Sequence, residues 1–286
     1  MLLEQMLFEN VGVPVPGELV RLIVALAGVA IATYYDVFNR KNIPDKFLYG
    51  FLAVAVLLNL VFFDADLLIF TMCVALFFAV VGYVFYRAGQ IGGADVITMV
   101  CIVLLVPFVP SFASMPFRVP FIIPVIIFGG LLFAVYATAK FGLKILSEGG
   151  NPRVVYGLLI IPYLIFAYVY ATSPLFSPTY FGIITVLLLA TIFFMMYKDD
   201  INGMLAEELP VEQLEPEDVV AFELMDAELV KKLDLKRVLT EAEIEKLKQA
   251  NIASIWIYTN LPPFLPFLLM GMLLAMFFSN ALLFGL

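Results

Sequence analysis

The sequence predicts an all-α fold, a polytopic transmembrane helix bundle of about eight spans with a small soluble cytoplasmic insert. Three observations lead to this prediction. Of 286 residues, 63% are hydrophobic and 14% are charged, whereas soluble domains are about half apolar and about a quarter charged. Apolar runs of roughly 18 residues recur along the chain, and backbone groups in lipid must bond within their own segment. The short alternating strands of a membrane barrel do not occur in the sequence.

Charged residues, prolines and glycine clusters bound the apolar runs and so define the expected helices. The fourth run contains Pro107 and Pro110 near its end, and the sixth and seventh are separated by a short polar segment. The expected helices cover residues 17–35, 47–63, 66–86, 95–112, 119–140, 153–172, 176–197 and 262–284.

The chain divides into four expected parts. Residues 1–16 form a short external leader, and residues 17–197 hold membrane helices one to seven. Residues 198–261 form the soluble insert, which is charged and poor in aromatic residues, and residues 262–286 hold the final membrane helix. Within the insert, Thr240 and Glu243 have the spacing of a capping box at the start of a helix.

The positions of lysine and arginine predict the orientation in the cell membrane, because cytoplasmic loops retain these residues. If the loop over residues 38–46 is cytoplasmic, the count of spans puts most basic residues and the whole insert on that side. Only Arg21 and Arg118 then face the outside. Both ends of the chain are expected to be external.

Composition also excludes several kinds of active site. The chain has no histidine, which removes Ser-His-Asp and Cys-His arrangements and H-E-x-x-H zinc proteases together. Cys73 and Cys101 lack the C-x-x-C spacing of a zinc site. We therefore expect no metal and no cofactor. The formal charge of -8 comes largely from the insert, and we expect no nucleic acid as a partner.

Two aspartates stand at the expected cytoplasmic boundary. Asp36 closes the first helix and Asp95 opens the fourth, although a carboxylate at membrane depth costs about 2.5 to 3.5 kcal/mol. Two carboxylates at one depth are what aspartic proteolysis requires. One is ionised to take a proton from water, and the other is protonated to polarise the scissile carbonyl. The residues before Asp95 (Gly92, Gly93 and Ala94) are small enough for close approach of a substrate backbone.

Helix ends suggest roles for the pair. Asp36 lies at a carboxyl end and Asp95 at an amino end, which favours Asp36 as the acid and Asp95 as the base. A structural interpretation stays open, in which Asp36 pairs with Arg40 at the interface and Asp95 caps its helix.

These residues resemble a known family over residues 20–112. Tyr35-Asp36, the basic stretch over residues 39–44 and the Gly92-Gly93-Ala94-Asp95 segment are similar to GxGD-type membrane aspartic proteases, specifically archaeal type IV prepilin and preflagellin peptidases. The resemblance implies that Asp36 and Asp95 are the catalytic pair, supported by Tyr35 and the three small residues. It implies as substrates type IV pilin-like or archaellin precursors, whose short basic leader is cut from a hydrophobic helix in the membrane lipid.

The end of the chain adds to the resemblance, and two positions depart from it. Residues 239–245 and the proline-rich segment over residues 261–267 are similar to the insert and final helix of one archaeal branch. Ala94 stands where the motif has glycine, and Ile97 replaces a basic residue, which bears on substrate positioning. The cysteine loop of bacterial relatives that also methylate the new amino terminus is absent, so we expect no methyltransferase activity.

Two other functions stay open. A signal-peptide-peptidase or presenilin-like protease uses similar aspartates, but its Pro-Ala-Leu signature is missing and Pro262-Pro263 only imitates it. A proton-coupled transporter could use the two aspartates as relay groups, although its sites belong near the bilayer midplane.

Overall fold

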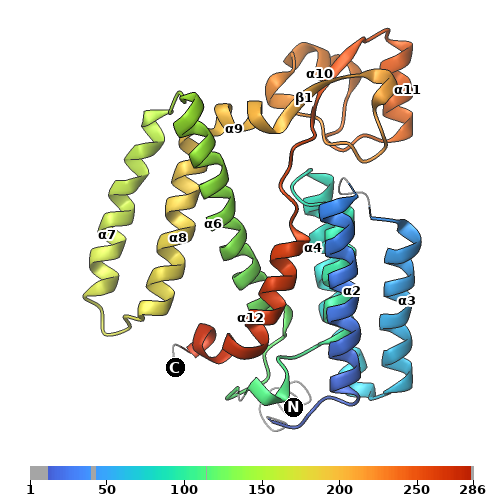
Figure 1. Cartoon of the computed structure of the whole chain (residues 1–286), viewed down its shortest axis with the longest axis vertical. Coiled ribbons are helices and arrows are strands. Elements are labelled where there is room, and N and C mark those ends of the chain that lie inside the picture. Colours follow the sequence, from blue (N-terminus) through green and yellow to red (C-terminus); the bar gives the residue numbers. More distant parts are fainter. Residues whose placement is uncertain (1–11, 40–42, 114, 285–286) are drawn as a thin grey trace.

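The computed structural model describes residues 12–39, 43–113 and 115–284. Long helices run side by side, and a compact segment with two short strands lies at one end of them (Figure 1). Helices occupy all eight predicted positions. Within the described ranges, six are long and apolar enough to cross a membrane, and the fold is therefore that of a helical membrane protein.

The eight helices differ from their predicted bounds mainly at their ends. The two shortest in the amino-terminal half, α3 and α5, have 17 and 13 residues. The bounds are α2 Glu18–Phe38, α3 Asp45–Val61, α4 Ala65–Arg87, α5 Gly93–Leu105, α6 Ile122–Glu148, α7 Ile160–Ala171 preceded by the 3-10 helix η3 Val154–Leu159, α8 Pro178–Met196 and α12 Leu265–Phe284.

The prediction that the fourth helix reaches residue 112 is wrong, because α5 ends at Leu105. Pro107 disfavours helical backbone at the residue before it, and Val106 has φ -124° and ψ 78°. The chain then returns through a loop that contains the 3-10 helix η2 Ser111–Ala113. In this loop the Val109 N–H donates to the Val119 carbonyl at 2.9 Å.

Because α5 ends at Leu105, no N–H group of this helix donates to the Leu104 carbonyl. Two buried side chains donate hydrogen bonds to this oxygen instead. Asn59 Nδ2 donates to this oxygen at 2.8 Å and Arg21 Nη1 at 3.3 Å. Arg21 is 1% exposed and also donates to the Pro16 carbonyl and to Asn59 Oδ1. Arg21 therefore lies inside the bundle, where it joins α2, α3 and α5. The external side of the membrane expected for Arg21 stays a prediction.

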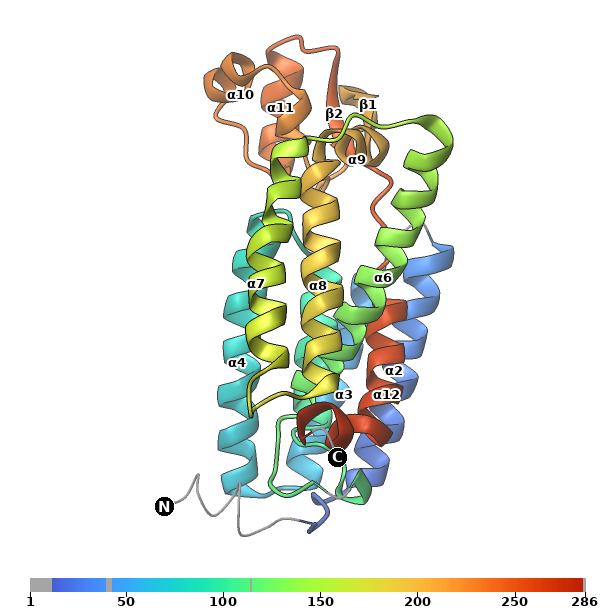
Figure 2. The same ribbon diagram turned by 90° about the vertical axis from the view of Figure 1, so that its left-hand side faces the viewer.

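The helices form two groups joined by the last one. Helices α2 to α5 pack together, α6 to α8 stand apart from them, and α12 lies between the groups against α6 and α2 (Figure 1). Seen from the side, α7 and α8 run next to each other on the outer face (Figure 2). No residue of α7 is buried, as expected for an apolar helix that faces lipid.

The segment between α8 and α12, called the insert, has a hydrophobic core of its own. Its two strands pair antiparallel, with Ala206 opposite Tyr258, and Leu239, Leu247 and Ile257 are among the residues that fill its core. The predicted capping box is confirmed, since Glu243 Oε2 accepts the Thr240 N–H at 2.9 Å. The elements are α9 Lys198–Leu205, β1 Ala206–Pro210, η4 Val211–Gln213, η5 Phe222–Leu224, α10 Ala227–Leu233, α11 Glu241–Gln249 and β2 Ser254–Tyr258.

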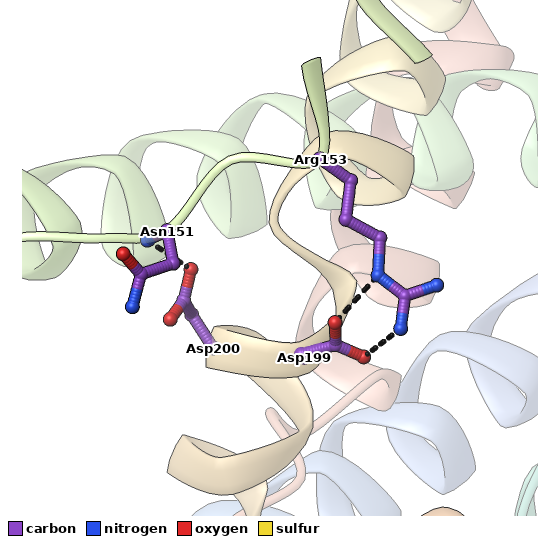
Figure 3. Close-up of polar contacts among 4 residues, drawn as sticks. All are labelled: Asn151, Arg153, Asp199 and Asp200. Atoms are coloured by element: carbon purple, nitrogen blue, oxygen red, sulfur yellow. Dashed lines mark hydrogen bonds and ion pairs between the residues drawn. The ribbon is translucent and has the colours of Figure 1, made fainter. Parts of the chain in front are cut away.

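The start of the insert is fastened to the loop between α6 and η3 (Figure 3). Arg153 donates from Nε and Nη2 to the two oxygens of Asp199, at 2.6 and 2.8 Å. The Asn151 N–H donates to Asp200 Oδ2 at 3.0 Å. These contacts join α9 to the ends of the second helix group at the side where the insert lies.

Most of the predicted leader over residues 1–16 lies outside the described residues, which begin at Gly12. Its last part packs on the bundle. Val15 is buried in a small cluster with Leu67 and Phe108. This segment leads into the start of α2, at the end of the molecule opposite the insert (Figure 1).

Two glycines let α6 and α12 approach at backbone distance. A Cβ atom at Gly271 would lie 2.5 Å from the Val125 carbonyl oxygen, and one at Gly129 would lie 2.9 Å from the Phe267 carbonyl oxygen. Real Cβ atoms do not come this close to backbone, so neither position accepts a side chain without separating the helices. Small residues have this role at many membrane helix crossings. The crossing sets the position of the start of α12.

A matched pair of alanine substitutions tests this crossing. Gly129→Ala should lower the free energy of unfolding by about 1 to 3 kcal/mol, because the added methyl group meets backbone. At the adjacent Gly130 a Cβ atom would have nothing within 4 Å, so Gly130→Ala should leave stability equal or slightly higher. Thermal unfolding in detergent measures both, and equal stability of the two variants would contradict the assignment.

Candidate active site

Asp36 lies in the last turn of α2 and is buried, with 8% of its surface exposed. Its Oδ2 accepts the backbone N–H of Leu265, the first residue of α12, at 3.1 Å. A buried carboxylate needs such a donor, because burial without hydrogen bonds costs several kcal/mol. The residues that meet here are separated by 229 positions in the chain.

The start of α12 presents a free N–H group for a structural reason. The first N–H groups of any helix have no acceptor within it, and Pro266 supplies no N–H at all. The helix bonds begin with Phe267 and Leu268, which donate to the Phe264 carbonyl at 3.0 and 3.1 Å. The Leu265 N–H is therefore left to bind a group outside α12, and it binds Asp36.

Asp95 lies in the first turn of α5, three residues after the cap. Gly92 is the cap residue with extended backbone, and Asp95 Oδ2 accepts its N–H at 3.2 Å. The structural interpretation was wrong that Asp95 itself is the cap, because Gly92 is the cap residue. Asp95 nevertheless stabilises the start of its own helix, from the third helical position. A Cβ atom at Gly92 would lie 3.1 Å from Asp95 Oδ2, so a side chain there would crowd the carboxylate.

The structure brings the two aspartates together. Helix α2 packs against α5, and the carboxylates of Asp36 and Asp95 are close enough to interact electrostatically. The predicted partner of Asp36 in the structural interpretation, Arg40, lies outside the described residues. Two carboxylates from separate helices therefore share one environment at the end of the bundle near the insert.

The remaining residues of the predicted site support the pair by packing. The Tyr35 ring lies 5.9 Å from that of Phe47 and is half-buried against the core. The Ala94 carbonyl accepts the Thr98 hydroxyl at 2.8 Å, and Ala94 also packs on the core. Gly93 has the Tyr86 ring and a carboxylate oxygen of Glu217 beside it, at 3.5 and 3.8 Å from where its Cβ would be.

Two members of this environment were not predicted from the sequence. The Leu265 amide was missed because a backbone N–H has no sequence signature, although the prolines around it indicate a rigid helix start. Glu217 comes from the insert, and the sequence carried no sign that it reaches the turn before Asp95.

Comparisons with known proteins add no relative: no protein-family model, no curated protein and no solved structure matches this chain.

The contact between Asp36 and α12 predicts different effects for two substitutions. Asp36→Ala should lower the free energy of unfolding by about 1 to 3 kcal/mol, because the buried Leu265 N–H loses its acceptor. Asp36→Asn keeps an oxygen acceptor and should unfold near the wild-type temperature.

Asp66→Ala is the control, since Asp66 is an exposed residue in the first turn of α4. Thermal unfolding in detergent separates the three variants. If Asp36→Ala were as stable as Asp36→Asn, the hydrogen bond to α12 would not hold the carboxylate.

Proposed function

We propose that this chain is a membrane-embedded aspartic endopeptidase that removes the short basic leader from type IV pilin-like or archaellin precursors. The observation that carries the proposal is the placement of Asp36 and Asp95, which lie on the packed helices α2 and α5 and are near enough for their charges to interact. Two neighbouring carboxylates at membrane depth are costly unless they serve chemistry. The proposal includes no metal, no cofactor and no methylation step.

The pair can carry out peptide hydrolysis with one shared proton. The ionised carboxylate takes a proton from water while the protonated one donates its proton to the carbonyl oxygen, and the water oxygen bonds to the carbonyl carbon. In the second step the tetrahedral diol returns a proton to the first donor as its carbonyl reforms. The other aspartic acid then gives its proton to the leaving amine as the C–N bond breaks.

The positions of Asp36 and Asp95 at helix ends do not decide which one is the acid and which one is the base. Asp95 accepts an N–H at the start of its own helix, and Asp36 accepts one at the start of α12. Both carboxylates therefore have the same kind of donor, and either one can serve as the acid or as the base.

In the proposed topology all eight helices cross the membrane, with the insert and the aspartates on the cytoplasmic side. The course of the chain supports this topology, because the insert lies at one end of the bundle and α12 runs from there to the other end (Figure 1). The basic residues at the insert end fit the retention of lysine and arginine in cytoplasmic loops. They include Arg87, Lys144, Arg153 and Lys198.

The signal-peptide-peptidase-like alternative shares the same chemistry and differs in substrate. The contact of Asp36 with the proline-rich start of α12 favours either protease equally. The position of both aspartates at helix ends favours a protease over a proton-coupled transporter, whose relay groups belong at the midplane. Incubating the purified protein with a pilin-like precursor and, separately, with a signal-peptide remnant distinguishes the two proteases by which substrate is cleaved.

Removing either carboxylate should stop leader cleavage. Asp36→Asn and Asp95→Asn should each lower the cleavage rate at least about 100-fold, because general acid–base groups contribute about 10² to 10⁴. Leader loss from a pilin-like precursor, seen by gel shift and mass spectrometry, is the measurement. Asp66→Asn is the control that should retain activity, and near wild-type cleavage by either dyad variant would refute the assignment.

Reporter fusions test the topology independently of activity. A reporter fused after Lys232 should be cytoplasmic, and one fused after Leu286 should be external, because one span separates them. Protease protection in spheroplasts gives the side of each. Both reporters on the same side would remove α12 from the spans and with it the proposed position of the active site.

A further inference from the structure

The insert packs directly on the turn that leads to Asp95. Gly89 follows α4 with φ +68°, and a Cβ atom there would lie 2.9 Å from both Val219 and Arg237 of the insert. Four residues later, Gly93 has Glu217 beside it. The insert therefore covers one side of the segment over residues 89–93 that positions a candidate catalytic carboxylate.

Glu217 is held in place by its backbone. Its N–H donates to the Leu239 carbonyl at 2.9 Å, and the Leu239 N–H donates to the Asp218 carbonyl at the same distance. The adjacent Val219 pairs with Val238 in an antiparallel bridge. Glu217 has φ +75°, a left-handed conformation that favours glycine and is unfavourable for a residue with a side chain.

The Glu217 side chain is exposed and lies near Tyr86 at the end of α4. The ion pairs within 4.0 Å among the described residues use Asp199, Glu223 and Glu243 as acids, and Glu217 is not one of them. Its negative charge is therefore available to a cation that arrives from solution.

The nearest arginine of the insert is already neutralised. Arg237 Nη2 donates to both oxygens of Glu223, at 2.9 and 3.1 Å. Burial tends to raise the pKa of Glu223, but hydrogen bonds from the backbone, Arg237 and Tyr258 outweigh it and lower the pKa. Glu223 is then ionised at neutral pH and balances the charge of Arg237.

We propose that Glu217 is a specificity-determining residue that selects precursors with a positively charged leader. The inference rests on the proposed function. With the scissile bond at the aspartate pair and the substrate helix in the membrane, the leader extends toward the insert. A carboxylate beside Gly93 is then next to the leader residues that have just left the site, and opposite charges raise the rate of productive encounter.

Reciprocal changes of charge on enzyme and substrate test the proposal. The substrates are one pilin-like precursor with its basic leader and the same precursor with the leader lysines and arginines changed to glutamine or to glutamate. Glu217→Gln keeps the size of the side chain and removes its charge. It should lower kcat/KM for the basic leader by about 5-fold, the effect of one exposed ion pair, and leave the neutral leader unchanged.

Glu217→Lys should cleave the acidic leader faster than the wild-type protein does. The control is Glu212→Gln, which removes another exposed charge of the insert, in η4, and should change the cleavage of neither substrate. Raising the salt concentration should reduce the preference of the wild-type protein and not that of Glu217→Gln.

A purely structural role gives a different result. If Glu217 only docks the insert, Glu217→Gln lowers cleavage of all three leaders equally, and this outcome overturns the proposal. A second variant, Glu217→Gly, suits φ +75° without strain, so it should stay folded and still lose the charge preference. Cleavage by the wild-type protein without any charge preference overturns this inference alone. Failure of the wild-type protein to cleave any precursor overturns the proposed function itself.

Discussion

The hydrogen bond from the Leu265 N–H to Asp36 joins α12 to α2 at the candidate active site. This bond forms only if the first residue of α12 lies at the depth of Asp36 in the bundle. The crossing of α12 with α6 at Gly129 and Gly271 sets that depth. The hydrogen bond also explains the prolines around the helix start, which fix the backbone and leave one donor free. A substitution at the glycine crossing, far from the aspartates, should therefore shift the start of α12 and with it the position of Asp36.

The opposite end of α2 follows the same rule for buried polar groups. Arg21 and Asn59 satisfy the carbonyl that α5 leaves open when Pro107 ends it. Each end of α2 thus carries one buried ionisable residue, and each is satisfied by backbone groups of other helices. In an apolar bundle these directional contacts set the register of the helices, because burial of apolar surface alone is not directional.

The positions of the eight helices, the insert and both aspartates could be predicted from the sequence, because hydropathy, proline and charge act locally along the chain. The capping box at Thr240 was predictable for the same reason. The burial of Arg21, the donor to Asp36 and the approach of Glu217 to Gly93 could not be predicted. Each depends on which distant segments meet, and a backbone N–H or an exposed glutamate carries no sequence pattern of its own.

The central claim is that Asp36 and Asp95 act as one coupled pair. Infrared difference spectroscopy with labelled aspartate, recorded during a pH titration of the folded protein in lipid, measures this coupling directly. The account predicts that Asp95→Asn changes the titration of Asp36, and that Asp36→Asn changes the titration of Asp95, because each carboxylate feels the charge of the other. Two aspartates whose titrations are independent of each other's substitution would contradict it.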